Sequence, residues 1–262
     1  MKKFEVKEFS NKFFELGVKK GDVLLVHSSL LNFGTPTDCK ISKVPSQLFS
    51  DLRDTIGDEG NIAVPTFNFD FCKGLAFNRQ ETPSKNMGVF SEFVRKLPIA
   101  QRSHHPMQSI AVVGRQSGYI IENDTESAFS PEGPFDRLKE LEGKILLLGA
   151  DFNSVSMIHL IEEKYNVPYR YWKTFSGTYT DNNDTYNKSY KTFVRSLENN
   201  PILKMYSIER ELKRIKKLQE APIGGGVIKI FDIKDFLMIA ENYIQQNPYF
   251  FISNHQNYEI RY

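Results

Sequence analysis

The residues best suited to acid–base chemistry are His159 and Glu162, which stand three positions apart in the segment VSMIHLIEEK at 155–164. Periodic apolar residues predict a helix there, and residues three apart lie on one helix face. A carboxylate one turn from an imidazole can fix its tautomer and raise its basicity, so the pair could take a proton from a substrate. Two alternatives stay open: the pair lies on a solvated face with Glu162 bound to a lysine, or Glu163 replaces Glu162.

A second polar group, Ser28 and Ser29, follows the apolar segment VLLVH at 23–27. Hydroxyls and free backbone N–H groups at a strand end can bind an anion, or they can simply cap the next helix. A serine after a strand is also where some hydrolases carry their nucleophile, but the neighbours of Ser28 lack the glycines of the G-x-S-x-G turn. This absence argues against a serine hydrolase.

A third group lies in the irregular segment RSHHPMQS at 102–109, which contains Arg102, His105 and Ser109. Irregular segments of this composition often carry binding residues. The adjacent histidines His104 and His105 are poor joint zinc ligands and no third ligand is evident, so no metal site is predicted. Arg102 could equally serve a structural salt bridge.

The frame that must position these residues follows from apolar periodicity. Short apolar runs predict strands at 23–27, 61–67, 110–113, 144–148 and 227–232. Helical spacing predicts helices at 7–18, 44–56, from Pro83 or Ser84 to Val94, and at 155–164, 202–219 and 234–246. The strand–helix–strand order over 23–67 is typical of a βαβ unit, so we expect an α/β fold with a mixed central sheet flanked by helices.

The chain of 262 residues is 40% hydrophobic and 25% charged, which is typical of a globular protein and excludes disorder. Without an evident linker or repeat, we expect a single domain over 1–262 with a polar excursion at about 172–220. The first part of this excursion is rich in Thr, Asn, Tyr and Ser, and predicts a strand pair or a substrate-facing insertion. Gly224, Gly225 and Gly226 predict a loop tip because they lack a phosphate-loop pattern.

Charge, cysteine content and hydropathy exclude several classes of protein. The 34 Lys and Arg residues nearly balance the 32 Asp and Glu residues, which argues against nucleic acid as a partner. Cys39 and Cys72 are too few for a disulfide scaffold or a cysteine-rich zinc site. The start has no apolar signal-peptide region, and no segment approaches the ~18 apolar residues of a membrane span. We therefore expect a cytoplasmic protein without a membrane partner, as a monomer or homodimer.

Six segments carry a resemblance through their order and spacing: GDVLLVHSSLLNFG, GNIAVPTF, ETPSKNMGVFSEFVRKLP, QRSHHPMQSIAVVG, SPEGPFDRLKELEGKILLLG and IHLIEEKYNVPYR. Together they resemble the aminoglycoside N3-acetyltransferase family of acetyl-CoA-dependent enzymes, which is distinct from the GNAT acetyltransferases. The resemblance runs over about residues 10–175 and resumes at 224–240.

The resemblance implies direct acetyl transfer from acetyl-CoA to the amine of a small molecule, with no metal. His159, oriented by Glu162, would be the general base, with His105 as the competing candidate. The Ser28 and Ser29 region, with nearby N–H groups, would stabilise charge on the thioester oxygen. The matching segments imply a cofactor site formed by Ser28, Ser29, Thr82, Pro83, Ser84, Met87, Gly88, Arg102 and Ser109. His105, Tyr171 and Trp172 are the candidate contacts to the acceptor.

The acceptor expectation departs from the family's drug-modifying members, for which the resemblance implies an acidic surface. Asp181, Asp184 and Glu198 are the only acids in 172–200, and 202–219 is basic. This balance favours a less cationic amino sugar, such as a nucleotide-linked one destined for a surface polysaccharide. The donor could also carry a longer acyl chain. The alternative is a catalytically inactive homologue that binds a carbohydrate or nucleotide, although an inactive protein has no chemical need for His159 and Glu162.

Overall fold

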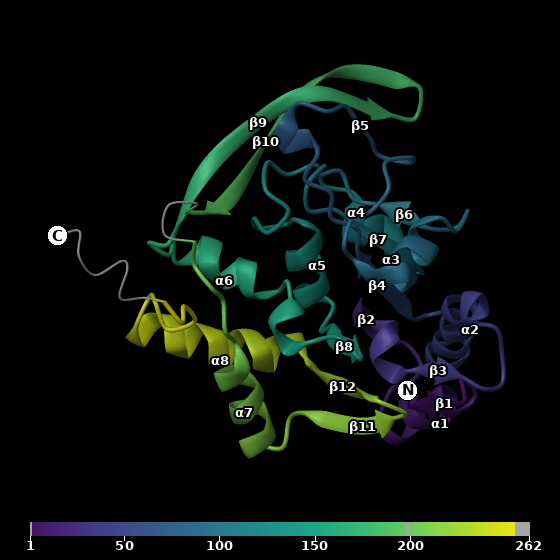
Figure 1. Cartoon of the computed structure of the whole chain (residues 1–262). Helices are drawn as coiled ribbons and strands as arrows, with labels where there is room; N and C mark the ends of the chain where they lie inside the picture. The colour runs from purple at the N-terminus through teal and green to yellow at the C-terminus, as the bar shows by residue number, and fades with distance from the viewer. Residues whose placement is uncertain (1, 197–199, 255–262) are drawn as a thin grey trace.

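The computed structural model describes residues 2–196 and 200–254 (Figure 1). Its centre is a seven-stranded sheet in the order β11-β12-β8-β2-β4-β7-β6. The strands are β2 (Val23–Ser28), β4 (Asn61–Pro65), β6 (Gln101–Arg102), β7 (Ile110–Gly114), β8 (Lys144–Leu148), β11 (Gln219–Ile223) and β12 (Gly226–Asp232). Strands β8, β2 and β4 run parallel, whereas the other neighbours pair antiparallel. The expected α/β fold with a mixed sheet is confirmed.

Both faces of the sheet are covered by helices because its strands are apolar on both sides. In β2, Val23 and Leu25 join one core cluster while Leu24 and Val26 join the other. Helices α1 (Glu8–Glu15), α2 (Val44–Ile56) and α3 (Gly88–Arg95) pack on the second cluster's face. The first cluster's face carries α4 (Ser117–Ile121), α5 (Pro134–Glu140), α6 (Ile158–Lys164), α7 (Tyr206–Arg214) and α8 (Ile233–Gln246).

The parallel strands β2 and β8 place two candidate segments at the same edge of the sheet. Ser28 of β2 is in register with Leu148 of β8. The chain then continues into the short 3-10 helices η1 (Leu30–Phe33) and η4 (Phe152–Ser154), and from η4 into α6. Open α/β sheets bind ligands at the carboxyl ends of such strands.

A long hairpin, β9 (Arg170–Asp181) with β10 (Asp184–Arg195), forms a second sheet with β5 (Phe77–Asn78). In Figure 1 it curves away from the end of α6 and passes over the loop 122–133. We call the hairpin together with this loop the arch. The strand pair anticipated for 172–200 is confirmed as far as the described residues extend, and Glu198 lies outside them.

Two element boundaries differ from the sequence prediction. The helix expected over 202–219 ends at Arg214, and Lys216 takes a positive φ of 59° before the chain enters β11. The helix expected from Pro83 or Ser84 begins only at Gly88, because 82–87 forms a loop. Gly224 and Gly225 connect β11 to β12, so the predicted loop tip is confirmed.

Small elements complete the fold. Strands β1 (Lys3–Phe4) and β3 (Thr35–Pro36) form a two-stranded sheet, and 3-10 turns η2 (Ile41–Lys43) and η3 (Phe71–Lys73) lie in loops. Within residues 2–196 and 200–254, no helix has the length and apolar character needed to cross a bilayer.

Candidate active site

The side chains of His159 and Glu162 meet on α6 as the i, i+3 spacing predicts. Nδ1 of His159 lies 2.5 Å from Oε2 of Glu162. The Glu162 side chain is fully buried, whereas 22% of the His159 side chain is exposed. The alternative that this pair lies on a solvated face is therefore wrong, since the carboxylate is removed from solvent while the imidazole remains accessible.

Glu162 is held by two residues just beyond α6. The hydroxyl of Tyr169 donates to Oε1 at 3.0 Å, and Nε of Arg170 lies 2.9 Å from Oε2. Burial tends to raise the pKa of Glu162, but the charges of Arg170 and His159 outweigh burial and lower it. Glu162 is thus a carboxylate at neutral pH. The sequence prediction missed Tyr169 and Arg170, although both lie in the matching segment NVPYR.

Glu163 has a different role from Glu162. Both of its carboxylate oxygens accept from the hydroxyl of Ser127, at 2.7 and 2.9 Å. Burial raises the pKa of Glu163 to about 7, against the opposing effect of the Ser127 hydrogen bond. Two residues further along the same loop, the Phe129 ring packs edge-on against His159 with centroids 5.0 Å apart. Glu163 therefore ties the loop 122–133 to α6.

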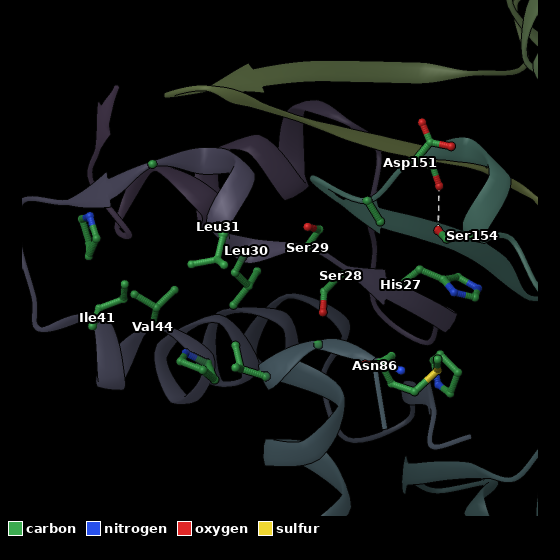
Figure 2. Close-up of a pocket in the computed structure, with 18 of the residues that line it drawn as sticks. His27, Ser28, Ser29, Leu30, Leu31, Ile41, Val44, Asn86, Asp151 and Ser154 are labelled. Carbon is green, nitrogen blue, oxygen red and sulfur yellow. Dashed lines mark hydrogen bonds between the residues drawn. The ribbon is translucent and has the colours of Figure 1, made fainter. Parts of the chain in front are cut away.

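A groove of 860 Å³ opens beside the end of β2 and reaches the start of α6. Figure 2 shows Leu30, Leu31, Ile41 and Val44 at one end and His27, Asn86 and Ser154 at the other, with Ser28 and Ser29 between them. Four sequence-predicted residues line it: Ser28, Ser29, Met87 and Gly88. The backbone N–H of His159 donates to the carbonyl of Ser156, another lining residue, at 3.1 Å. The lining residue Ser156 thus lies one turn before His159 in the chain, and His159 itself is not among the lining residues.

Three buried polar atoms of the groove lack a hydrogen-bond partner among the described residues. They are Nε2 of His27, Oγ of Ser28 and Oγ of Ser156. Burial lowers the pKa of His27 to about 4, so its ring is neutral at pH 7. Buried polar atoms without partners are uncommon and indicate a ligand or bound solvent. Sequence reasoning missed His27 and Ser156.

Gly88 allows α3 to approach β2 closely. Its φ is +84°, and a Cβ built there would lie 2.7 Å from the Ser28 carbonyl oxygen. Both the conformation and the contact favour glycine. The N-terminus of α3 therefore lies against Ser28 at the wall of the groove.

The loop residues Thr82, Pro83 and Ser84 do not line the groove. The Thr82 hydroxyl accepts from the backbone of Asn78 at 2.8 Å, and the Pro83 carbonyl accepts from Asn68 at 2.8 Å. Ser84 donates its hydroxyl to Glu92 at 2.8 Å. Thr82, Pro83 and Ser84 therefore bind other residues of the chain. Their positions do not support the cofactor contacts expected of them.

Arg102 and Ser109 also lie away from the groove lining, and both are buried. Nε of Arg102 donates to the Ser109 hydroxyl at 2.9 Å, and the guanidinium donates to the carbonyls of Thr66 and Thr82 at 2.8 and 2.6 Å. These contacts support a structural role for Arg102 better than a cofactor role. The expected salt bridge to a carboxylate is replaced by hydrogen bonds to hydroxyls and backbone carbonyls.

Of the groups in the Ser28 and Ser29 region that were expected to stabilise a thioester oxygen, the backbone N–H of Ser29 is already engaged. This N–H donates to the carbonyl of Leu148 at 2.9 Å, continuing the pairing of β2 with β8. Its hydrogen is therefore used inside the sheet. The Ser28 hydroxyl remains available, as described above.

The three expected acceptor contacts separate into one buried and two exposed side chains. His105 is buried, its Nε2 donates to the Lys191 carbonyl and its Nδ1 accepts from the Gln108 N–H, each at 3.0 Å. Burial lowers the pKa of His105 to about 4. Both ring nitrogens are engaged within the chain, one of them by the arch residue Lys191, so this geometry does not support His105 as an acceptor contact. Tyr171 and Trp172 are exposed on β9.

Within the described ranges 2–196 and 200–254, no cluster of three or more His, Cys, Asp and Glu side chains is arranged to hold a metal ion. A neutral imidazole with one nitrogen held by a buried carboxylate is suited to accepting a proton at the other.

Comparison with known proteins places this site in a family. The model of the family described as aminoglycoside 3-N-acetyltransferase matches residues 25–245. Aminoglycoside N(3)-acetyltransferase IV of Salmonella sp is 28% identical over 251 residues, covering 94% of this chain and 89% of that protein.

Two solved structures share the fold. The apoenzyme of aminoglycoside acetyltransferase AAC(3)-IVa has a TM-score of 0.77 at 26% identity, covering 97% of this chain and 96% of the other. The fold of AAC-IIIb, solved as a binary complex with CoASH, matches with a TM-score of 0.78 at 18% identity over 96% and 98% of the two chains. The protein described here belongs to the aminoglycoside 3-N-acetyltransferase family of acyltransferases.

Proposed function

We propose that the protein transfers an acetyl group from acetyl-CoA to the amine of an amino sugar, with His159 as general base and Glu162 as the residue that orients it. We further propose that the arch, within a single domain, shapes the acceptor site. The observation that carries the proposal is the buried Glu162 carboxylate bound to a partly exposed imidazole, on the helix that begins just after the groove residue Ser156.

The base assignment rests on how the two ring nitrogens of His159 are used. Nδ1 is bound to Glu162, and no described residue hydrogen-bonds Nε2. Nε2 can therefore accept the proton of the acceptor amine while the imidazolium is stabilised by the carboxylate. A positioned base of this kind contributes about 10²–10⁴-fold to a rate.

The reaction balances with these residues alone. Acetyl-CoA supplies an acetyl thioester. As the amine nitrogen bonds to the thioester carbonyl carbon, Nε2 of His159 takes the amine proton. Breakage of the carbon–sulfur bond then expels the thiolate, to which the imidazolium can return the proton. The Ser28 hydroxyl is a candidate donor to the developing oxyanion, since Oγ is buried and unpartnered among the described residues.

The groove fits CoA in shape and chemistry. Its wall is largely aliphatic, as a pantetheine arm requires, and the unpartnered atoms of His27, Ser28 and Ser156 can meet the polar groups of that arm. No Lys or Arg among the described residues lines it. The phosphates would then depend on the N-termini of α2 and α3, where Val44 and Val89 border the groove.

For the acceptor we propose an amino sugar with little positive charge, of which a nucleotide-linked sugar is an example. The hairpin supports this: within 170–195 it carries Lys or Arg at 170, 173, 188, 191 and 195 but acids only at 181 and 184. Two of these cations, Lys188 and Lys191, neutralise the acids Asp124 and Glu126 of the loop 122–133, which a cationic acceptor would otherwise find unpaired. The basic helix α7 gives no such support. Lys213 and Arg214 pair with Glu220 and Glu211, and α7 lies at the opposite end of the view from the hairpin (Figure 1).

The two other sequence-level functions fit less well. For a serine hydrolase, Ser28 needs a hydrogen-bonded base, yet its Oγ has no partner among the described residues. For an inactive binding protein, the assembled His159, Glu162 and Arg170 cluster has no purpose.

The test is a thiol-release assay with acetyl-CoA and a panel of amines that includes single-amine sugars, nucleotide-linked amino sugars and aminoglycosides. We expect release with at least one amine, and its loss in His159→Ala. Absence of release across the panel, or full activity of His159→Ala together with loss in His105→Ala, would overturn the proposal.

A further inference from the structure

The arch contains an aromatic cage that is occupied by the chain's own lysine. Nζ of Lys188 lies 5.5, 6.0 and 5.1 Å from the ring centroids of Tyr179, Tyr186 and Tyr190. The Asp124 carboxylate forms an ion pair with Lys188 and accepts from the Tyr190 hydroxyl at 3.0 Å. Three aromatic faces and a carboxylate are the groups that proteins use to bind ammonium ligands.

This cage is open to solvent and connected to the base. The Lys188 side chain is 27% exposed, so its ammonium is not sealed inside the hairpin. Asp124 belongs to the loop 122–133. The same loop reaches α6 through the hydrogen bond from Ser127 to Glu163 and the contact of Phe129 with His159. One loop thus carries both Asp124 of the cage and Phe129, which packs against His159.

The charges around the cage balance only because Lys188 is present. Nε of Arg79 lies 2.9 Å from the second nearby acid, Asp181. Burial, aided by the charge of Arg79, lowers the pKa of His104 to about 4, so that ring is neutral at pH 7. Asp124 is then neutralised by Lys188, and loss of the lysine's charge would leave a net negative aromatic site.

We propose that Lys188 is a specificity-determining residue: its ammonium fills a site in the arch that would otherwise bind an ammonium group of the acceptor. The protein thereby selects acceptors with a single amine and disfavours polyamine acceptors. This inference rests on the proposed function, and it assigns the selectivity to one side chain.

The test compares Lys188→Met with the matched variant Lys173→Met. Methionine keeps an unbranched apolar chain among the tyrosines but removes the charge. Lys173 is an exposed lysine of the same hairpin whose Nζ lies 5.1 Å from the Phe175 ring and which has no place in the cage. Calorimetric titration with kanamycin, a polycationic probe, is made in the presence of CoA. We expect Lys188→Met to bind kanamycin about tenfold more tightly than the wild type, and Lys173→Met to bind like the wild type.

A second variant keeps the inference falsifiable if methionine disturbs the hairpin. Lys188→Arg retains a cation in the cage and should bind kanamycin as weakly as the wild type. Equal kanamycin affinity in Lys188→Met and the wild type, or an equal gain in Lys173→Met, would overturn the assignment. If the wild type released no thiol with any amine, the proposed function would fail, whereas the titration would still decide whether Lys188 fills an ammonium site.

Discussion

The groove beside β2 and the arch differ in whether their polar side chains have partners within the chain. In the groove, His27, Ser28 and Ser156 each present a buried atom that no described residue satisfies. In the arch, three acids are paired within the chain: Asp124 with Lys188, Glu126 with Lys191 and Asp181 with Arg79. Because unpartnered atoms gain from a ligand and paired ones do not, we infer that the groove binds a ligand, whereas the proposed role of the arch is to select acceptors by exclusion.

The largest effect is expected at His159, which Phe129 of the arch contacts and which lies one turn after the groove residue Ser156. His159→Ala should lower kcat by about 10²–10⁴-fold, because it removes the proton acceptor from the transition state. CoA affinity, measured by calorimetry, should stay near the wild-type value since the groove is intact. A comparable loss of CoA binding would instead place His159 in the donor site.

Arg170→Met should cause the next largest effect, on stability. It leaves the fully buried Glu162 carboxylate without its main opposite charge, and breaking a buried pair in this way costs about 3–5 kcal/mol. Chemical denaturation of wild type and variant at pH 7 measures the difference. Arg195→Met, at an exposed position of the same hairpin, is the control and should change stability little. Equal stability of Arg170→Met and wild type would contradict the account of Glu162.

Glu162→Gln should lower kcat by less than His159→Ala. The imidazole survives, but an amide holds it less firmly and does not stabilise the imidazolium as a carboxylate does. Steady-state kinetics at saturating CoA gives the comparison. A loss equal to that of His159→Ala would mean that the two side chains act only as a unit.

The smallest effect is a pH dependence at Glu163, where the arch is tied to α6. Its pKa is raised from 4.5 to about 7 in the folded protein, so the folded state binds the proton more tightly. The stabilisation from this group is therefore present below about pH 4.5 and is lost as the pH rises through 7. Glu163→Gln should remove that part of the dependence, measured as the difference in unfolding free energy from wild type between pH 5 and 8. If the unfolding free energies of wild type and Glu163→Gln changed equally between pH 5 and 8, the raised pKa of Glu163 would be refuted.

The elements around the groove could be predicted from the sequence better than the contacts of the arch. The helix at 44–56 and the strand at 144–148 match their observed bounds, because local apolar periodicity determines them. The same holds for Ser28 and His159, which follow strands that the sheet brings together. Thr82 and Ser84 were misplaced because loop residues satisfy each other in ways that spacing does not reveal.

The pairings of the arch join residues far apart in the chain. Lys188 lies opposite Asp124, and His105 binds the carbonyl of Lys191. Such contacts depend on how a hairpin curves over a loop, which leaves no local signal in composition or periodicity. The composition of 172–200 predicted that this region carries few acids. The structure shows which cation pairs with Asp124 and which with Asp181.

The most direct test of the contrast is the protection of the fold by CoA in wild type and in the double variant Ser28→Ala/Ser156→Ala. Without ligand, the variant should be as stable as the wild type or more so, since it loses two buried hydroxyls that lack partners. CoA at about 100 times its Kd should stabilise the wild type by about 2.7 kcal/mol, and the variant by clearly less at the same concentration. Equal protection of both proteins, or no protection of the wild type over a wide range of CoA, would contradict the assignment of the groove.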